Sequence, residues 1–254
     1  MNRFLAFTKK EWMEQIRTFK TLIVFLILLL FGLTSPLLAK LTPEMLKLFP
    51  IEGLNLAIPE PTWMDAYAQF FKNMTQMGVI VLLLVFNGLL SQELSKGTLI
   101  NMLSKGLPRS TVILSKFTAA SILWTLSYAV SALANYGYAV FLFGNPFPPH
   151  LFFACLSLWL LGELIIALLL FATTLVSGNY GGLLLTGGVL CLLLLISILP
   201  QSAPFNPITL GSGNMGLLTG DTALGDMASA CIVTVVLIVL CLAGAILRFR
   251  KKQL

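Results

Sequence analysis

The sequence predicts an all-α membrane protein with six transmembrane helices. Of its 254 residues, 57% are hydrophobic and only 10% are charged, whereas roughly a quarter of the residues of an ordinary soluble domain are charged. The apolar residues also gather into runs of about 20, the length at which a helix crosses the hydrocarbon core of a bilayer. We expect a single transmembrane domain over residues 1–254. It comprises an interfacial helix over 1–20 and spans over 21–39, 74–91, 117–143, 151–176, 181–199 and 227–247.

The first apolar run has a second interpretation. A charged start, an apolar stretch and the pair Leu38-Ala39 are also typical of a cleaved signal peptide. The charged region before the run is, however, 20 residues long and contains Glu11 and Glu14. Because signal peptides begin with a short basic segment, this favours a retained cytoplasmic helix.

Lysine and arginine are distributed unevenly between the segments that join the spans. Thirteen of the 16 lie in the N-terminal segment, in the loop after the second span and in the C-terminal tail. Only Lys40, Lys47 and Lys72 lie on the opposite side, together with six of the 10 acidic residues. Since cytoplasmic loops are enriched in lysine and arginine, both termini are expected in the cytoplasm.

Charge and cysteine usage argue against two other classes of protein. The net charge is +6, but the basic residues lie at membrane edges instead of on one continuous face, so nucleic acid is not an expected partner. All four cysteines fall inside predicted spans without paired spacing. The sequence therefore indicates neither a disulfide framework nor a metal site.

Residues 3–20 have the pattern of an amphipathic helix. At 100° per residue, Leu5, Trp12, Ile16 and Phe19 fall on one side and charged residues fall on the other. Such a helix is expected to lie along the membrane surface, where it also contacts lipid. The alternative is that it is only the soluble beginning of the first span.

Two segments on the external side are irregular. Residues 41–73 contain four prolines, which predict a small cap instead of a long helix. Residues 200–225 are almost uncharged and rich in glycine and proline, yet they carry several large apolar residues. We expect a pair of short re-entrant helices that dip into the outer leaflet, with an ordinary surface loop as the alternative.

The longest cytoplasmic loop runs from Gln92 to Phe117 and reads QELSKGTLINMLSKGLPRSTVILSKF. From Thr98 onward its apolar residues gather on one helical face, which predicts a short interfacial helix. Gly106-Leu107-Pro108 ends that helix, and Ser110 is expected to cap the next one. A soluble partner could push on such a helix, or the helix could lie flat on lipid headgroups; the pattern alone leaves both open.

The loop resembles that between the second and third helices of ABC-2 type transporter permeases. The resemblance lies in Glu93, Gly97-Thr98, Pro108-Arg109-Ser110 and Lys116, and it extends to Lys10-Glu11 and Arg17, six spans and the irregular segment before the last span. It implies the permease subunit of a bacterial ABC exporter in the plasma membrane. Two such subunits, identical or paralogous, would meet along spans one, two and five and would bind two separate ATPase subunits.

The resemblance also implies how energy is supplied. The chain has no G-x-x-x-x-G-K-[ST] phosphate loop, so it is not expected to be an enzyme by itself, and ATP and Mg²⁺ would bind the partner subunit. The residues expected to contact the ATPase are Lys10, Glu11, Glu14, Glu93, Lys96, Gly97 and Thr98. Charge pairs at that contact would set its register more than its affinity.

Three polar residues inside predicted spans are candidates for a substrate path or for helix packing. Glu163 is the only acidic residue in a span, and an ionisable group there is costly enough to indicate a function. It could bind a cationic substrate group, or it could pair with a backbone group or a hydroxyl in a buried helix contact. Asn87 and Asn135 could hydrogen-bond across the bundle or touch substrate.

Two rival functions are weaker. A secondary transporter driven by an ion gradient would usually place several ionisable or broken-helix sites near the midplane, and the sequence has one acid there and no clear internal repeat. An intramembrane enzyme would need a nucleophile with its base, or clustered metal ligands. The apolar spans favour a hydrophobic or amphipathic cargo such as a peptide, drug or lipid.

Overall fold

The structure is a computed structural model that describes residues 3–48, 60–95, 97–104, 106–144, 148–176, 178 and 180–251. It is 86% helical, and no strand occurs among these residues. Five of the described helices are long and apolar enough to cross a membrane. They are Lys20–Met45, Trp63–Ser95, Arg109–Phe143, Leu151–Leu175 and Met227–Lys251. The chain is therefore a multi-pass, all-α membrane protein.

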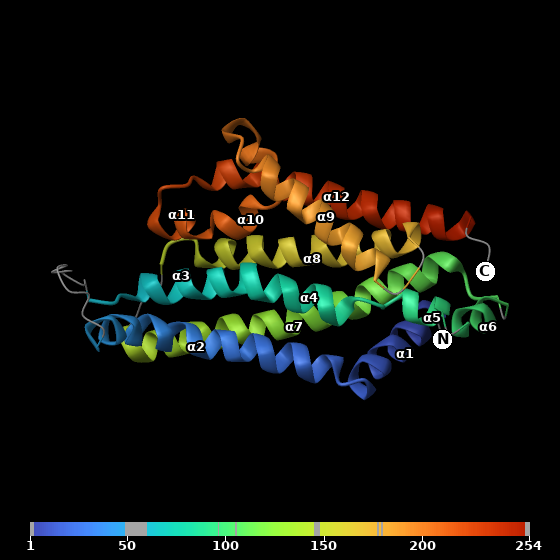
Figure 1. The fold of residues 1–254 in the computed structure, drawn as a ribbon, viewed down its shortest axis with the longest axis horizontal. Helices are drawn as coiled ribbons and strands as arrows, with labels where there is room; N and C mark the ends of the chain where they lie inside the picture. The colour runs from blue at the N-terminus through green and yellow to red at the C-terminus, as the bar shows by residue number, and fades with distance from the viewer. Residues whose placement is uncertain are drawn as a thin grey trace.

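The helices form an elongated bundle (Figure 1). In chain order they are α1 (Arg3–Arg17), α2 (Lys20–Leu48), α3 (Trp63–Asn73), the π-helical η1 (Met74–Gly78), α4 (Val79–Phe86), α5 (Ser91–Ser95), α6 (Thr98–Ser104), α7 (Arg109–Phe143), α8 (Leu151–Leu175), α9 (Gly181–Ile196), the 3₁₀ helix η2 (Pro200–Phe205), α10 (Thr209–Ser212), α11 (Asn214–Thr219) and α12 (Leu224–Lys251). Both ends of the chain and the α5–α6 segment lie at the same end of the bundle (Figure 1).

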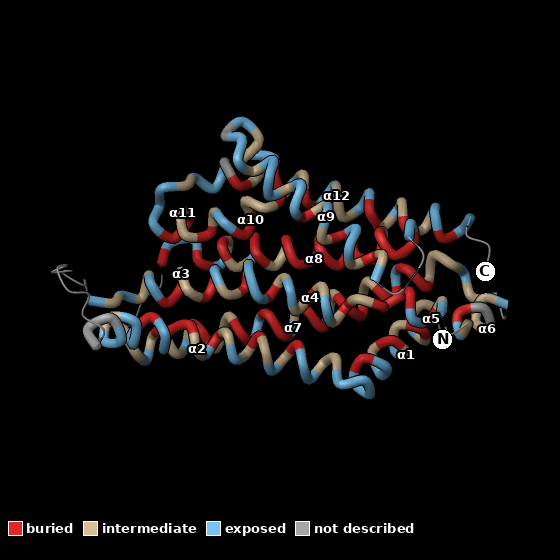
Figure 2. Tube along the Cα trace, viewed as in Figure 1, coloured by how far each residue is buried: buried red, intermediate tan, exposed pale blue. Residues whose placement is uncertain are grey.

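Helix α8 is the centre of the bundle. It is apolar around its whole circumference, as expected for a helix surrounded by others, and it is mostly buried (Figure 2). At Gly162 it lies so close to α7 that an added Cβ would be 2.3 Å from the Trp124 ring. The Trp124 indole also donates to the Trp159 carbonyl at 3.0 Å, and the Tyr128 hydroxyl donates to the Cys155 carbonyl at 3.1 Å. These donors fix α7 against the backbone of α8.

The predicted sixth span, 181–199, is a shorter helix than the others. Helix α9 has 16 residues and is therefore roughly 24 Å long, less than the roughly 30 Å of a hydrocarbon core. Residues 200–205 turn away from its end as η2. The sixth crossing accordingly stays a prediction.

The expectation of a small cap over 41–73 is wrong for the described part of that segment. Helix α2 continues through Pro43 to Leu48, because an internal proline removes one backbone donor without ending the helix here. Helix α3 begins at Trp63 and runs directly into η1 and α4. The helix of the predicted span 74–91 therefore starts 11 residues earlier, where the Thr62–Asp65 capping box satisfies its first N–H groups.

The other end of this helix also differs from expectation. It stops at Phe86, and a turn over residues 87–90 with Gly88 at φ +85° separates it from α5. Helix α6 begins at Thr98 as predicted. Ser110 does not cap the following helix, because α7 already begins at Arg109, with Pro108 at its N-cap.

The two short helices expected within residues 200–225 are present as α10 and α11. Leu210, Leu217 and Leu218 bury their side chains, and Gly211 lies against Thr75 and Leu161 so closely that an added Cβ would be within about 3 Å of each. The segment therefore packs on the bundle, in agreement with the burial that its large apolar residues predict. Its depth in a membrane remains a prediction.

Candidate functional site

Helix α1 lies across the end of the bundle that holds both termini (Figure 1). Its buried residues are Phe7, Glu11 and Gln15. Leu5 and Ile16, on the apolar face expected at the membrane surface, are exposed. The helix therefore turns Phe7 and two polar residues inward, toward the protein. Leu5 and Ile16 remain free for lipid, whereas Trp12 packs against the core of the bundle.

The inward face carries a network of charges that we call the ionic cluster. It comprises Lys10, Glu11 and Glu14 of α1, Glu93 of α5 and Lys116 of α7. Lys116 pairs with Glu11 at 2.9 Å and with Glu93 at 2.7 Å. Lys10 pairs with Glu14 at 2.7 Å, with Glu11 at 3.1 Å and also with Glu93. Three of these five ion pairs join different helices: Lys10–Glu93 joins α1 to α5, Lys116–Glu11 joins α7 to α1, and Lys116–Glu93 joins α7 to α5.

Most of the ionic cluster is shielded from water. Lys116 is 1% exposed, Glu11 2% and Glu93 7%, so breaking a pair would leave a buried charge uncompensated. Burial lowers the pKa of Lys10, but hydrogen bonds to Glu14 and Glu93 and the charge of Glu11 raise it more, and the resulting pKa lies well above its usual range. Lys10 therefore stays charged at neutral pH.

The three carboxylates are close enough together to resemble a metal site. Oxygen atoms of Glu11, Glu14 and Glu93 lie within 4.8 Å of one another. The ammonium groups of Lys10 and Lys116 lie among them, however, and compensate two of the three negative charges. The arrangement is that of a structural ion-pair network.

An apolar cluster next to the charges reinforces the same contacts. Phe7 of α1, Leu99 of α6, Ile113 of α7 and Phe249 of α12 bury their side chains together. The Arg109 guanidinium donates to the Phe249 carbonyl at 2.6 Å, at the C-terminal end of α12. Because arginine satisfies the last carbonyls of a helix well, this contact attaches the end of α12 to the start of α7.

The residues expected to contact an ATPase are largely brought together by the structure. Lys10, Glu11, Glu14 and Glu93 all belong to the ionic cluster. Gly97 has φ +67°, which explains a glycine at the turn before α6. The Thr98 hydroxyl donates to the Glu93 carbonyl at 3.3 Å. Lys96 lies outside the described residues.

Lys116 is the member of the ionic cluster that sequence reasoning left out of the expected contact. It lies on a buried face of α7 with Val112, Ile113, Ala119 and Ala120. A single lysine on such an apolar face is the signal that could have identified it, because a buried lysine needs a partner.

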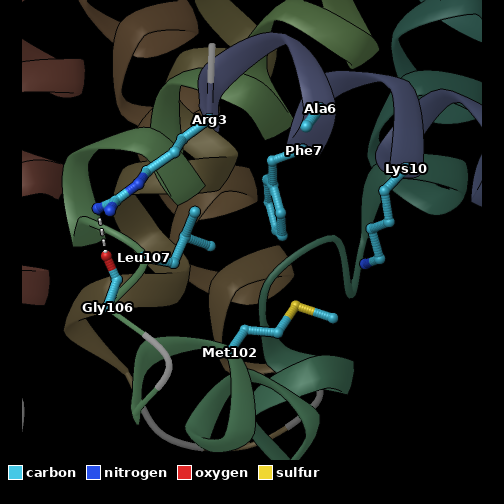
Figure 3. A pocket seen from close by; sticks show the side chains of 7 residues that line it. All are labelled: Arg3, Ala6, Phe7, Lys10, Met102, Gly106 and Leu107. Atoms are coloured by element: carbon cyan, nitrogen blue, oxygen red, sulfur yellow. Dashed lines mark hydrogen bonds between the residues drawn. The ribbon is translucent and has the colours of Figure 1, made fainter. Parts of the chain in front are cut away.

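A cleft opens beside the ionic cluster, between α1 and α6 (Figure 3). It has a volume of about 350 Å³ and is lined by Arg3, Ala6, Phe7, Lys10, Met102, Gly106 and Leu107. The Arg3 guanidinium crosses one end and donates to the Gly106 carbonyl at 2.9 Å. The Lys10 ammonium lies 5.2 Å from the centre of the Phe7 ring. The cleft therefore combines an apolar floor with basic groups at its edges.

The three polar residues of the predicted spans lie apart from this cluster. Glu163 is buried in α8 and accepts a hydrogen bond from the Ser121 hydroxyl at 2.7 Å, the pairing with a hydroxyl that was one of its two interpretations. Asn87 lies at the C-cap of α4 instead of within a helix. Asn135 is buried in α7, and among the described residues neither asparagine has a partner for its side-chain oxygen.

The fold and these contacts define a multi-pass, all-α membrane protein whose N-terminal helix and longest loop are fastened together by buried charges. Its C-terminal helix is attached to them by Arg109 and by apolar contacts. No protein-family model matches the chain, and a search of curated proteins finds no match. The resemblance to ABC-2 permeases therefore rests on the sequence pattern.

Proposed function

We propose that the chain is the permease subunit of an ATP-driven ABC exporter of the ABC-2 type. It would lie in a bacterial plasma membrane with both termini in the cytoplasm, and a separate subunit would hydrolyse ATP. The observation that supports this most is the ionic cluster, since it fastens α1 to α5 and α7 on either side of α6. The interfacial helix and the loop helix thereby form one block.

Such a block is suited to transmit force. Any movement of α1 or α6 is passed to Lys116, which lies two turns from the start of the 35-residue helix α7. Helix α7 then extends to the far end of the bundle (Figure 1). Because the pairs are buried, salt and water weaken them little. A partner that moves the block in the cytoplasm would therefore tilt or shift a helix across the whole membrane.

The cleft of Figure 3 is the proposed docking place for that partner. Phe7, Met102 and Leu107 offer apolar surface at its floor, and Arg3 offers positive charge at its edge, whereas Lys10 is already paired within the ionic cluster. An ATPase segment with an apolar side chain and neighbouring carboxylates would complement both features. This moves the expected contact from the buried carboxylates to the open cleft beside them.

Two further parts of the proposal concern assembly and cargo. Helices α9 and α12 carry long exposed apolar faces, including Leu184, Leu192, Leu195, Ile232 and Val239. With α9 as a sixth span, these faces would meet lipid or a second permease subunit. The apolar character of the bundle favours a hydrophobic or amphipathic cargo.

The docking proposal can be tested by co-purification. The chain would be co-expressed with the ATPase encoded in an adjacent reading frame, and the ATPase retained on the tagged chain would be quantified. Met102→Asp places a carboxylate in the cleft and is expected to reduce the retained ATPase at least tenfold, a loss of about 1.4 kcal/mol. Met45→Asp is the control, because Met45 is exposed near the far end of α2.

Two results would count against the proposal. One is equal retention of the ATPase by both variants, which would exclude the cleft as its docking place. The other is transport by the purified chain alone down an ion gradient without ATP, which would favour a secondary transporter.

A further inference from the structure

A second cavity, lined by both polar and apolar residues, lies toward the end of the bundle opposite the termini (Figure 1). This outer pocket has a volume of about 260 Å³ and is formed by α3 and η1 on one side and by α10 and α11 on the other. Its polar lining residues are Lys72, Thr75, Gln76, Ser212 and Asn214. None of the described lining residues is acidic.

The outer pocket lies at membrane depth if α8 spans the bilayer. Gly211 at its floor would place an added Cβ 3.0 Å from a methyl group of Leu161. Leu161 is ten residues into α8 (Leu151–Leu175), which corresponds to roughly 15 Å along the helix. Asn214, which also lines the pocket, bonds the Ala154 carbonyl, three residues into α8. The pocket therefore lies in the half of a roughly 30 Å hydrocarbon core that is farther from the termini. A cavity with polar lining residues at this depth requires an explanation.

Lys72 is the charged group of the pocket. It is an exposed residue of α3, in the continuous helical run Trp63–Phe86 of the second candidate span. No ion pair or hydrogen bond joins its ammonium to another described residue. Lys10 and Lys116, by contrast, are each paired with at least two carboxylates. An ionisable residue within a membrane helix marks a functional site by default. Lys72 therefore offers an uncompensated positive charge at the mouth of the pocket.

Asn214 supplies a buried hydrogen-bond acceptor beside the pocket. Its side chain is 1% exposed, and its amide nitrogen donates to the Ala154 carbonyl at 2.6 Å and to the Ser157 hydroxyl at 3.2 Å. These contacts fix the orientation of the amide, and the side-chain oxygen has no partner among the described residues. A buried acceptor without a partner costs roughly 1–3 kcal/mol, so a water molecule or a hydroxyl group of a ligand, and not an anionic oxygen, is expected beside it.

The backbone is shaped for such a cavity. The helix changes to π geometry over Met74–Gly78, and π turns often occur at functional sites because they widen the helix locally. The Thr75 hydroxyl donates to the Gly211 carbonyl at 3.1 Å and so holds the two walls together. Gln76, one turn beyond Lys72, adds an amide donor to the same wall.

We propose that the outer pocket binds the anionic headgroup, a phosphate or a carboxylate, of an amphipathic molecule. The Lys72 ammonium would pair with the anion, and Gln76 and Ser212 would donate hydrogen bonds to it. The cavity lies just below the usual range of about 300–1,000 Å³ for a whole small-molecule site, which suits a headgroup whose apolar chain lies along the bundle in the bilayer. The proposal goes beyond the exporter function and holds whether or not an ATPase drives the chain.

Thermal unfolding of the purified full-length chain, without any ATPase, tests this site. Unfolding in a neutral detergent would be followed by tryptophan fluorescence with added dodecyl phosphate, dodecyltrimethylammonium or inorganic phosphate. At a hundredfold excess over its dissociation constant, dodecyl phosphate is expected to raise the unfolding temperature by roughly 5 °C. The cationic surfactant and inorganic phosphate at the same concentration are not expected to do so.

Variants decide whether Lys72 is responsible. Lys72→Gln is expected to abolish the shift caused by dodecyl phosphate, and Lys72→Arg is expected to retain most of it. Lys40→Gln is the matched control, because Lys40 is an exposed lysine of α2 toward the same end of the bundle. A shift that survives in Lys72→Gln would overturn the proposal. A shift of the same size with inorganic phosphate would overturn the amphipathic ligand in favour of a free oxyanion.

Discussion

Lys116→Met is expected to destabilise the protein more than substitution of Lys10, the other lysine of the ionic cluster. The Lys116 ammonium is 2.9 Å from Glu11 and 2.7 Å from Glu93, and the residue is 1% exposed. Methionine fills a similar volume but leaves both carboxylates with Lys10 as their remaining partner in the cluster. Removing one partner of a buried pair costs about 3–5 kcal/mol.

This free energy converts to a measurable shift in unfolding temperature. A chain of about 150–250 residues loses roughly 2–4 °C per kcal/mol, so Lys116→Met should unfold roughly 6–20 °C below the wild-type protein. The assay is tryptophan fluorescence during heating in detergent. Lys9→Met is the matched control: Lys9 is exposed on α1, and an exposed substitution changes stability by about 0.5 kcal/mol or less.

A double substitution separates the ion pairs from simple packing. Glu93→Gln in the Lys116→Met background removes one of the uncompensated charges, so the double variant should recover part of the lost stability. Coupling energies in such networks are typically about 0.5–3 kcal/mol. The reasoning is refuted if Lys116→Met unfolds within about 2 °C of the wild type, or if the double variant is as unstable as the sum of the two singles.

Three other expectations follow from the same structure. Glu163→Gln keeps an oxygen for the Ser121 hydroxyl, so unfolding should change by less than about 4 °C, or 1 kcal/mol, with transport retained; loss of transport alone would favour ion coupling. Gly162→Ala forces a methyl group against the Trp124 ring and should cost about 1–3 kcal/mol, whereas Gly137→Ala, with open space around it, should not destabilise. Raising ionic strength from about 0.1 to about 1 M should lower the unfolding temperature little, because the ionic cluster is buried; a fall of 6 °C or more would show that its charges are accessible to salt.

Much of the fold was predictable because it depends on local patterns. The apolar runs predicted the helices that became α2, α8 and α12, and the apolar face after Thr98 predicted α6. Helix α3 was not predicted because four prolines precede it, and prolines were taken to exclude a long helix throughout residues 41–73. The capping residues Thr62 and Asp65, which begin the helix, were a local signal that could have corrected this.

The ionic cluster could be predicted only in part, because it depends on tertiary contacts. Lys10, Glu11 and Glu14 are neighbours in sequence, but Glu93 and Lys116 reach them from α5 and α7. A charge pattern along one helix shows which residues share a face and says nothing about the element opposite. An amphipathic helix at a membrane surface was therefore expected to present its charges to a cytoplasmic partner, whereas the structure turns several of them toward the protein.

This inward orientation changes what a substitution at Glu93 can prove. A charge reversal there would place a third positive charge beside Lys10 and Lys116 and remove one carboxylate partner from each. A loss of ATP-driven transport would therefore report on folding as much as on coupling. Met102 lines the cleft and makes no ion pair, although it also packs against the apolar cluster, so its variant must be tested for folding as well. If Met102→Asp unfolds at the wild-type temperature yet no longer retains the ATPase, docking is separated from folding. If it retains the ATPase while a folded Glu93→Gln variant loses it, the buried cluster itself governs the docking surface.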